Sequence, residues 1–452
     1  MSLALGIALT ALVTTARPPD YGGEIISYVY GPSVTDDPAT TRTAADAAAH
    51  SAVFETLYAR RGDAWVPVLA DGLPRVELAR IVVPLRTDVV RHDGAIMTPA
   101  HVAEAFVRLE RIPRAAYVLK PVRRLEEGRP AVYALEDEPA VAFEFADPDP
   151  YFIHLLAADH ARLAWPSTSG PMVGTGPFRW YSATEQRPFV RHRDGRPFIG
   201  SVVWRPYASR FGATALAERG QAPIFGGPKP PRVFVGAGSW LILQIGSTIG
   251  DASLRERLRK HMQAALRRSR ITRRYMGPDE RANSGFIDTP LSETKVSVRG
   301  LRQLQLRAPR GLRFGHRLVE RVQLDLFRSG LQVQTRWVDR DAPSNASEDL
   351  RLFELRPGII DDGTPRAQMH RLLSAAAALG ALDRIEPALL KQFGEEDNPE
   401  VQQRTLQELD LLIRRVTGTV VVARTAPAVA LPAAMTVDAA GLIDWANLQG
   451  AP

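Results

Sequence analysis

The chain of 452 residues contains no cysteine. Disulfide bonds, thiolate metal sites, cysteine nucleophiles and attachment through a lipid-modified cysteine are therefore excluded. Histidine is also sparse, and no two of the nine histidines stand four residues apart, as paired metal ligands on one helix face would. We expect no metal site and no cofactor.

Long apolar runs are missing as well. The longest, residues 3–16, is too short to span a membrane comfortably and ends at Arg17-Pro18. Such a run is typical of the core of a secretory signal peptide, although no Lys or Arg precedes it. We predict a signal peptide over residues 1–19 and a periplasmic mature protein, with a buried N-terminal strand or helix as the alternative.

Catalytic motifs are absent or incomplete. The chain has neither Gly-x-Ser-x-Gly nor His-Glu-x-x-His, the signatures of a serine nucleophile elbow and of a zinc protease. Ser292-Glu-Thr-Lys295 matches the Ser-x-x-Lys motif of penicillin-interacting proteins, but the companion Lys-Thr-Gly and Ser-Asp-Asn motifs are missing. We therefore expect no catalytic residue and no enzyme activity.

The chain does have the composition of a globular protein, with 45% hydrophobic and 24% charged residues. Its length exceeds one ordinary core, so two or three domains are expected. The formal net charge of +7 comes mainly from arginines dispersed among acidic residues. In the one dense stretch, residues 255–274, the apolar side chains share a helical stripe, which favours a solvated helix face over a nucleic-acid site.

Two segments carry more specific signals, and the first runs from residue 81 to residue 106. An apolar run typical of a strand is followed by a His-Asp-Gly turn at 92–94 and by Thr98-Pro99, which starts a helix. Gly94 permits the reversal because glycine accepts positive φ, and Thr98 can cap the helix. We interpret the segment as a scaffold motif and not as a His–Asp relay.

The second segment is Gly174-Thr-Gly-Pro-Phe178, which precedes strand-like residues 189–194 and 198–207. Its paired glycines are one element of a phosphate-binding loop. The third spaced glycine and the Lys-Ser/Thr pair of such loops are absent, so the sequence disfavours a phosphate site.

In this order the two segments resemble the extracellular solute-binding proteins of family 5, which feed peptide and nickel ABC importers. Weaker similarities surround them: a turn at 36–38, a helix end at 54–57 and a Pro-x-Leu-Ala segment at 67–70. The resemblance covers roughly residues 22–448.

The resemblance implies an α/β protein with the two-lobed type II fold of periplasmic binding proteins. It implies the large-cluster subtype, which has an extra subdomain in lobe one and a ligand cleft between the lobes. We expect lobe one over residues 20–240 with its subdomain at about 45–165, lobe two over 241–424, and a return to lobe one over 425–452. The β-α-β order of residues 301–338 suits a doubly wound lobe two.

The resemblance also implies the substrate-binding component of an ABC importer. Such a protein is a monomer that captures a short peptide in the cleft and delivers it to an inner-membrane permease, with no nucleic-acid partner. The cleft residues implied by position are Tyr28, Tyr30, Trp240, Asp361 and Asp362, with an Asp accepting hydrogen bonds from the peptide ammonium. The alternatives are sheet-edge tyrosines, a core tryptophan and a solvated Asp-Asp-Gly turn.

Other functions stay open at this point. An oligosaccharide or a nickel complex is the alternative solute. The loop at 357–365 lacks the tryptophan that the family carries there, so a degenerate relative that acts as a sensor or interaction protein is a further alternative.

Overall fold

The computed structural model describes most of the chain between residues 22 and 430. The described residues are 22–30, 34–61, 64–146, 150–168, 170–195, 197–207, 224–225, 239–275, 281–282, 285–287, 296, 298, 303–309, 312, 315–338, 348–359, 363–396, 398–425 and 429–430. The predicted signal peptide, residues 1–19, lies outside them. Among the described residues, no helix is both long and apolar enough to cross a membrane.

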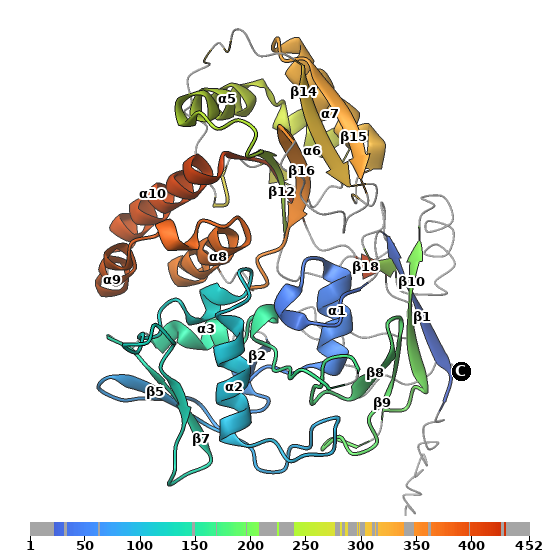
Figure 1. Cartoon of the computed structure of the whole chain (residues 1–452), viewed down its shortest axis with the longest axis vertical. Helices are drawn as coiled ribbons and strands as arrows, with labels where there is room; N and C mark the ends of the chain where they lie inside the picture. The colour runs from blue at the N-terminus through green and yellow to red at the C-terminus, as the bar shows by residue number, and fades with distance from the viewer. Residues whose placement is uncertain are drawn as a thin grey trace, which may run out of the picture.

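Lobe one, the lower part of Figure 1, is built on a six-stranded sheet with the order β18-β11-β1-β10-β9-β8. Strand β1 (Glu24–Tyr30) pairs in parallel with β10 (Ser201–Tyr207) and β11 (Ile224–Phe225). The other strands are antiparallel: β8 (Phe178–Ser182), β9 (Glu185–Pro188) and β18 (Val429–Ala430). Residues 189–194, expected as a strand, form a turn between β9 and β10.

Helix α1 (Ala44–Val53) packs its alanines against the lobe-one sheet. It begins at a capping box formed by Thr43, as the sequence pattern allows. The helix end expected at 54–57 lies beyond the helix, which ends at Val53, and Tyr58 lies in the hairpin of β2 (Tyr58–Arg61) and β3 (Ala64–Pro67). The carbonyl oxygen of Leu57 accepts backbone hydrogen bonds from residues 68 and 70, so pairing with this later segment replaces the last helical turn.

The subdomain of lobe one has a four-stranded antiparallel sheet of order β4-β5-β7-β6. Helix α2 (Pro99–Leu109) begins at the predicted Thr98 cap, and its buried face covers this sheet. The remaining elements are β4 (Arg75–Val76), β5 (Arg80–Pro84), β6 (Val132–Ala134), β7 (Ala140–Glu144), α3 (Ile153–Leu156) and the short 3-10 helices η1 (Pro38–Thr40), η2 (Ala116–Leu119), η3 (Pro150–Phe152) and η4 (Asp159–Ala161).

Lobe two, the upper part of Figure 1, has a second six-stranded sheet of order β13-β17-β12-β16-β14-β15. Strands β14 (Leu304–Pro309) and β15 (Val333–Val338) are parallel and are joined by α7 (Gly315–Arg328), which confirms the predicted β-α-β unit. The other strands are β12 (Ser239–Ile245), β13 (Arg281–Ala282), β16 (Leu350–Leu355) and β17 (Thr419–Thr425). The other helices are α5 (Ala252–Ala265), α6 (Arg268–Tyr275), α8 (Pro365–Ala378), η5 (Leu382–Arg384), α9 (Pro387–Glu395) and α10 (Pro399–Thr417).

The arginine-rich stretch 255–274 differs from the expected single solvated helix face. The helix is interrupted at residues 266–267, between α5 and α6. Arg259 is fully buried beside Glu256, and Arg268 is buried with its guanidinium donating to the carbonyl oxygens of Val421 and Gln263. These two arginines are part of the packing of lobe two, whereas Arg257, Arg267 and Arg273 are exposed.

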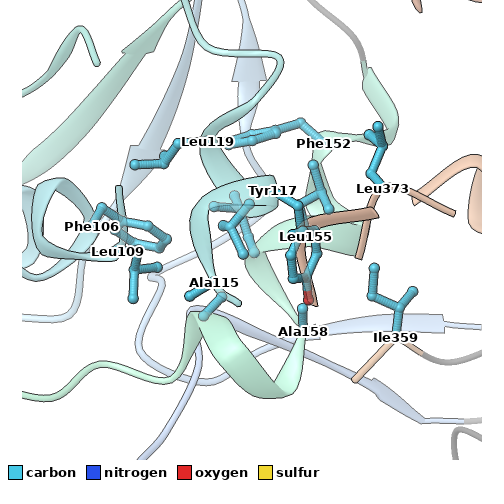
Figure 2. Close-up of a cluster of buried hydrophobic side chains, with 14 of the residues drawn as sticks. Phe106, Leu109, Ala115, Tyr117, Leu119, Phe152, Leu155, Ala158, Ile359 and Leu373 are labelled. Carbon is cyan, nitrogen blue, oxygen red and sulfur yellow. The ribbon is translucent and has the colours of Figure 1, made fainter. Parts of the chain in front are cut away.

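One apolar cluster continues across the boundary between the lobes. It contains residues of α2, η2 and α3 in the subdomain and residues of α8 and α10 in lobe two. Figure 2 shows Tyr117 and Leu155 of the subdomain beside Leu373 and Ile359 of lobe two. A shared apolar core of this kind resembles the interior of a domain more than a transient contact.

Candidate functional site at the lobe boundary

The two motifs singled out in the sequence meet in space. The backbone N–H of His92 donates to the carbonyl oxygen of Gly174 (2.9 Å), and the N–H of Gly174 donates to His92 Nδ1 (3.2 Å). Because Nδ1 accepts, Nε2 carries the proton and donates to the carbonyl oxygen of Gly176 (2.9 Å). Burial lowers the pKa of His92 to about 4, which keeps this neutral tautomer in place.

Both glycines of the second motif lie against the end of α1. A Cβ at Gly174 would stand 2.2 Å from the carbonyl oxygen of Val53, and one at Gly176 would stand 2.6 Å from that of Ala52. The N–H of Gly176 donates to Val53 (2.9 Å). Both glycine N–H groups are therefore occupied by the protein, so the motif joins α1 to the His92 turn instead of cradling a phosphate.

The predicted cleft residues fall in three places. Tyr28 and Tyr30 lie in β1, where the backbone pairs with residues 205 and 207 of β10; their side chains lie outside the described part. Asp361 and Asp362 lie outside the described residues. Their described neighbours are Ile359, which is buried, and the exposed residue 363 just before α8.

Trp240 lies at the start of β12, where the chain enters lobe two. Its side chain is fully buried, its ring N–H donates to the carbonyl oxygen of Phe286 (3.0 Å), and the Arg371 guanidinium lies 5.1 Å from its ring centroid. Ring and N–H are thus engaged by the protein in this conformation. A contact between Trp240 and a solute stays a prediction.

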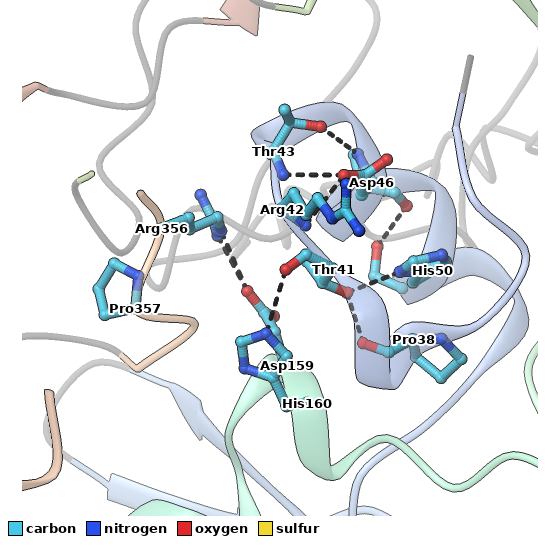
Figure 3. Close-up of polar contacts among 12 residues, drawn as sticks. Pro38, Thr41, Arg42, Thr43, Asp46, His50, Asp159, His160, Arg356 and Pro357 are labelled. Carbon is cyan, nitrogen blue, oxygen red and sulfur yellow. Dashed lines mark hydrogen bonds and ion pairs between the residues drawn. The ribbon is translucent and has the colours of Figure 1, made fainter. Parts of the chain in front are cut away.

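A buried ion pair joins the lobes at a site that the sequence did not single out. Both nitrogens Nε and Nη2 of Arg356, just after β16, lie within 3.2 Å of Asp159 Oδ2 in η4 (Figure 3). Arg162 approaches the other oxygen of Asp159 (3.2 Å). Burial raises the pKa of Asp159, but Arg356 and Arg162 outweigh it and hold the pKa below the ordinary value.

The residue after this aspartate, His160, continues the contact. Its Nε2 faces the carbonyl oxygen of Thr41 (3.1 Å) and must donate, so its Nδ1 accepts from the Tyr117 hydroxyl (3.0 Å). Burial lowers the pKa of His160 to about 4, and the positive charge of Arg114 acts in the same direction. His160 is therefore a neutral bridge between the subdomain and the start of α1.

Lobe two contacts His160 through the backbone of Gly358. Gly358 has φ of 71°, and a Cβ there would stand 2.7 Å from His160 Nδ1. The carbonyl oxygen of Gly358 accepts from the N–H of Asp159 (2.9 Å), and that of Pro357 accepts from the hydroxyl of Ser374 in α8 (2.5 Å). We call these contacts the interlobe cluster, which comprises Tyr117, Asp159, His160, Arg162, Arg356, Pro357, Gly358 and Ser374.

His154 and His160 are six residues apart in the sequence, a spacing that does not predict paired metal ligands on one helix face. Both are buried, and no group of three or more His, Asp or Glu side chains in the described part of the chain is placed to hold a metal ion. The signal for the interlobe cluster was the charged Asp-His-Ala-Arg at 159–162 between apolar runs. A charged run embedded in a buried stretch predicts a partner, but it does not say which one.

Comparison with known proteins identifies the fold. No protein-family model matches the chain, and no curated protein matches its sequence. The murein tripeptide binding protein MppA of Escherichia coli has a TM-score of 0.74 at 14% identity, covering 91% of this chain and 94% of that one. NikA of Staphylococcus aureus, solved with Ni(L-His)2, has a TM-score of 0.72 at 13% identity, covering 94% and 100%.

A third similar structure is the periplasmic binding protein DppA of Helicobacter pylori in complex with the peptide STSA. Its TM-score is 0.72 at 12% identity, covering 95% of this chain and 98% of that one. The chain therefore has the α/β, two-lobed fold of periplasmic binding proteins, and the predicted fold class is confirmed. Within that class, these neighbours are the peptide and nickel-complex receptors that the sequence motifs resemble.

Proposed function

We propose that the chain is the substrate-binding component of an ABC importer and captures a short peptide between its lobes. The observation that carries the proposal is the two-lobed fold, matched over more than nine-tenths of the chain to binding proteins whose named ligands are peptides or a nickel complex. Such a protein is a non-enzymatic, periplasmic monomer that passes its solute to a membrane permease.

Charged residues of both lobes are our candidates for holding the two ends of a peptide. Burial lowers the pKa of Arg351 on β16, and although Glu348 opposes this, the positive charges of Arg307 and of Arg42, before α1, lower it further. Arg42 and Arg351 thus repel each other from opposite lobes, and a carboxylate between them would relieve the repulsion. Asp361 and Asp362 follow in the chain and are our candidates for the peptide ammonium.

Tyr28, Tyr30 and Trp240 complete the proposed ligand-binding set. They come from the first strand of lobe one and from the strand that enters lobe two. A solute that touches residues of both lobes favours the closed conformation, because only differential affinity for one conformation shifts the equilibrium.

The test is native mass spectrometry of the protein purified from the periplasm of an expression host, followed by denaturation and identification of released molecules. We expect peptides with a free amino terminus. Asp361→Asn or Asp362→Asn should lower occupancy, while Asp137→Asn, an exposed aspartate in a subdomain turn, should leave it unchanged.

A thermal-shift assay with peptide pools can contradict the peptide proposal. Ligand at about a hundred times its Kd stabilises a fold by roughly 2.7 kcal/mol. Empty protein that shows no shift with peptide pools would contradict the peptide proposal. A shift with nickel and histidine together, and with neither alone, would support the second candidate, a nickel complex, which the NikA neighbour binds.

A further inference from the structure

The contact between the subdomain and lobe two has the character of a permanent core. Tyr117, Leu155 and Ala158 of the subdomain share one buried apolar cluster with Ile359 and Leu373 of lobe two (Figure 2). Apolar area removed from water stabilises an interface by about 25 cal/mol per Å². Separating the two lobes here exposes this surface to solvent, and that exposure opposes opening.

An aromatic contact extends the same boundary. The rings of His154 in α3 and His370 in α8 lie 5.8 Å apart, and the Arg366 guanidinium of α8 lies 5.4 Å from the ring of Tyr151. These residues belong to the same two surfaces as the shared apolar cluster. Lobe two is thus held on the subdomain along the length of α8.

The ion pair Asp159–Arg356 makes this contact depend on the charge at position 356. A buried pair contributes little net stability over separated, hydrated ions, but a buried charge that has lost its partner is strongly disfavoured. Arg356 comes from lobe two, whereas Asp159 and Arg162 both come from lobe one. In the docked arrangement Asp159 meets both arginines, and a neutral side chain at position 356 leaves this buried carboxylate with Arg162 alone.

We propose that the interlobe cluster is a latch that keeps lobe two docked on the subdomain and makes the closed conformation the resting conformation of the free protein. The solute then adds to a closure that the chain itself already favours. This inference does not depend on which solute binds, because its contacts lie entirely within the protein.

Gly358 allows the latch to be disturbed without changing a charge. Gly358→Ala places a methyl group against His160, and it strains a residue at φ of 71°. Gly380, after α8, has φ of 70° and no atom within 4 Å of the corresponding Cβ position. Gly380→Ala is therefore a matched control that reproduces the backbone strain without the collision.

The experiment measures the distance between the lobes in the free protein. Because the chain has no cysteine, Glu104→Cys on α2 and Glu320→Cys on α7, both exposed, place two nitroxide labels specifically. Double electron–electron resonance then gives the distance distribution with no solute added. The latch variants are Arg356→Gln and Gly358→Ala, and Arg356→Lys is the conservative variant that keeps the charge.

We expect a single short distance in the parent protein, in Arg356→Lys and in Gly380→Ala. Arg356→Gln and Gly358→Ala should each add a longer distance, with the open-to-closed ratio raised by about tenfold or more. The cause is the loss of one of the two counter-charges of Asp159 in the first variant and the collision with His160 in the second. A parent protein that is already open at rest, or a Gly380→Ala shift as large as that of Gly358→Ala, would overturn the proposal. Either result leaves the proposed peptide binding untouched, since no solute is present.

Discussion

The imidazole Nε2 of His92 lies 2.9 Å from the carbonyl oxygen of Gly176, and this contact joins the two most specific motifs of the sequence. The turn at 92–94 and the segment at 174–178 are far apart in the chain, yet they form one junction against the end of α1. The junction therefore joins the subdomain to lobe one.

The glycine requirement at this junction gives the first prediction. Gly176→Ala should destabilise the protein by about 3 kcal/mol, because the new Cβ would meet backbone atoms of Ala52 and Val53 that cannot move aside cheaply. Gly170→Ala, whose nearest neighbour would be a serine hydroxyl at 3.8 Å, should cost less than about 0.5 kcal/mol. Urea unfolding of both variants measures the difference, and equal losses would contradict the account.

Two buried histidines predict how stability depends on pH. His92 and His160 have pKa values of about 4 in the fold against 6.5 ordinarily, both mainly because burial disfavours the charged ring. Between these values the unfolded chain binds more protons, so stability should fall as pH drops from about 6.5 to about 4, by about 3 kcal/mol for each histidine.

The check is a comparison of the parent protein with His92→Gln in urea at several pH values. The parent should be the more stable of the two at pH 7. Its advantage should shrink as the pH falls through the same window, since the variant has one fewer histidine to protonate on unfolding. A constant advantage from pH 7 to pH 4 would show that His92 does not titrate as described.

The sequence predicted the parts of the fold that local chemistry determines. The Thr98 cap and the β14-α7-β15 unit rest on capping and on the periodicity of the sequence, and both appear in the structure. The helix end expected at 54–57 lies beyond the end of α1 at Val53, because the carbonyl oxygen of Leu57 accepts hydrogen bonds from residues 68 and 70 after β3. Long-range pairing overrode a local preference there.

The lobe boundary was the least predictable part from sequence. Asp159 and Arg356 are 197 residues apart, and nothing in either segment identifies the other. Gly358 shows why the partner matters, since its positive φ and close contact with His160 have meaning only when the two lobes are docked. A single sequence shows that a charge is embedded in an apolar stretch, and only the fold shows what neutralises it.

Glu55, the second residue after α1, gives the third prediction. Arg193 donates to both of its oxygens (2.6 and 2.8 Å). Burial raises the pKa of Glu55, but His192 and Arg193 outweigh burial and lower it to about 2. Glu55→Gln should therefore remove the close, buried counter-charge of Arg193, leave only the exposed Asp194 at 4.0 Å, and destabilise the protein by about 3 kcal/mol.

The surface pair Glu185–Arg187 serves as the comparison for that variant. Both side chains are substantially more exposed, so Glu185→Gln should cost less than about 1 kcal/mol. Thermal unfolding at neutral pH and moderate salt compares the two variants. Similar losses would mean that Glu55 contributes as a surface charge does, contrary to its burial.

The last prediction concerns the two arginines that repel each other across the boundary. If a peptide carboxylate lies between Arg42 and Arg351, Arg351→Gln should weaken binding of a peptide with a free carboxyl end by about tenfold, the loss expected for one charge-assisted hydrogen bond. The same peptide with an amidated end should bind both proteins equally. Arg336→Gln, an exposed arginine on β15, removes the same charge from the same lobe and should change neither affinity. Isothermal titration of the free and the amidated peptide into the parent protein, Arg351→Gln and Arg336→Gln measures these affinities. A general effect of charge would weaken binding equally in both variants, whereas a local contact weakens it only in Arg351→Gln.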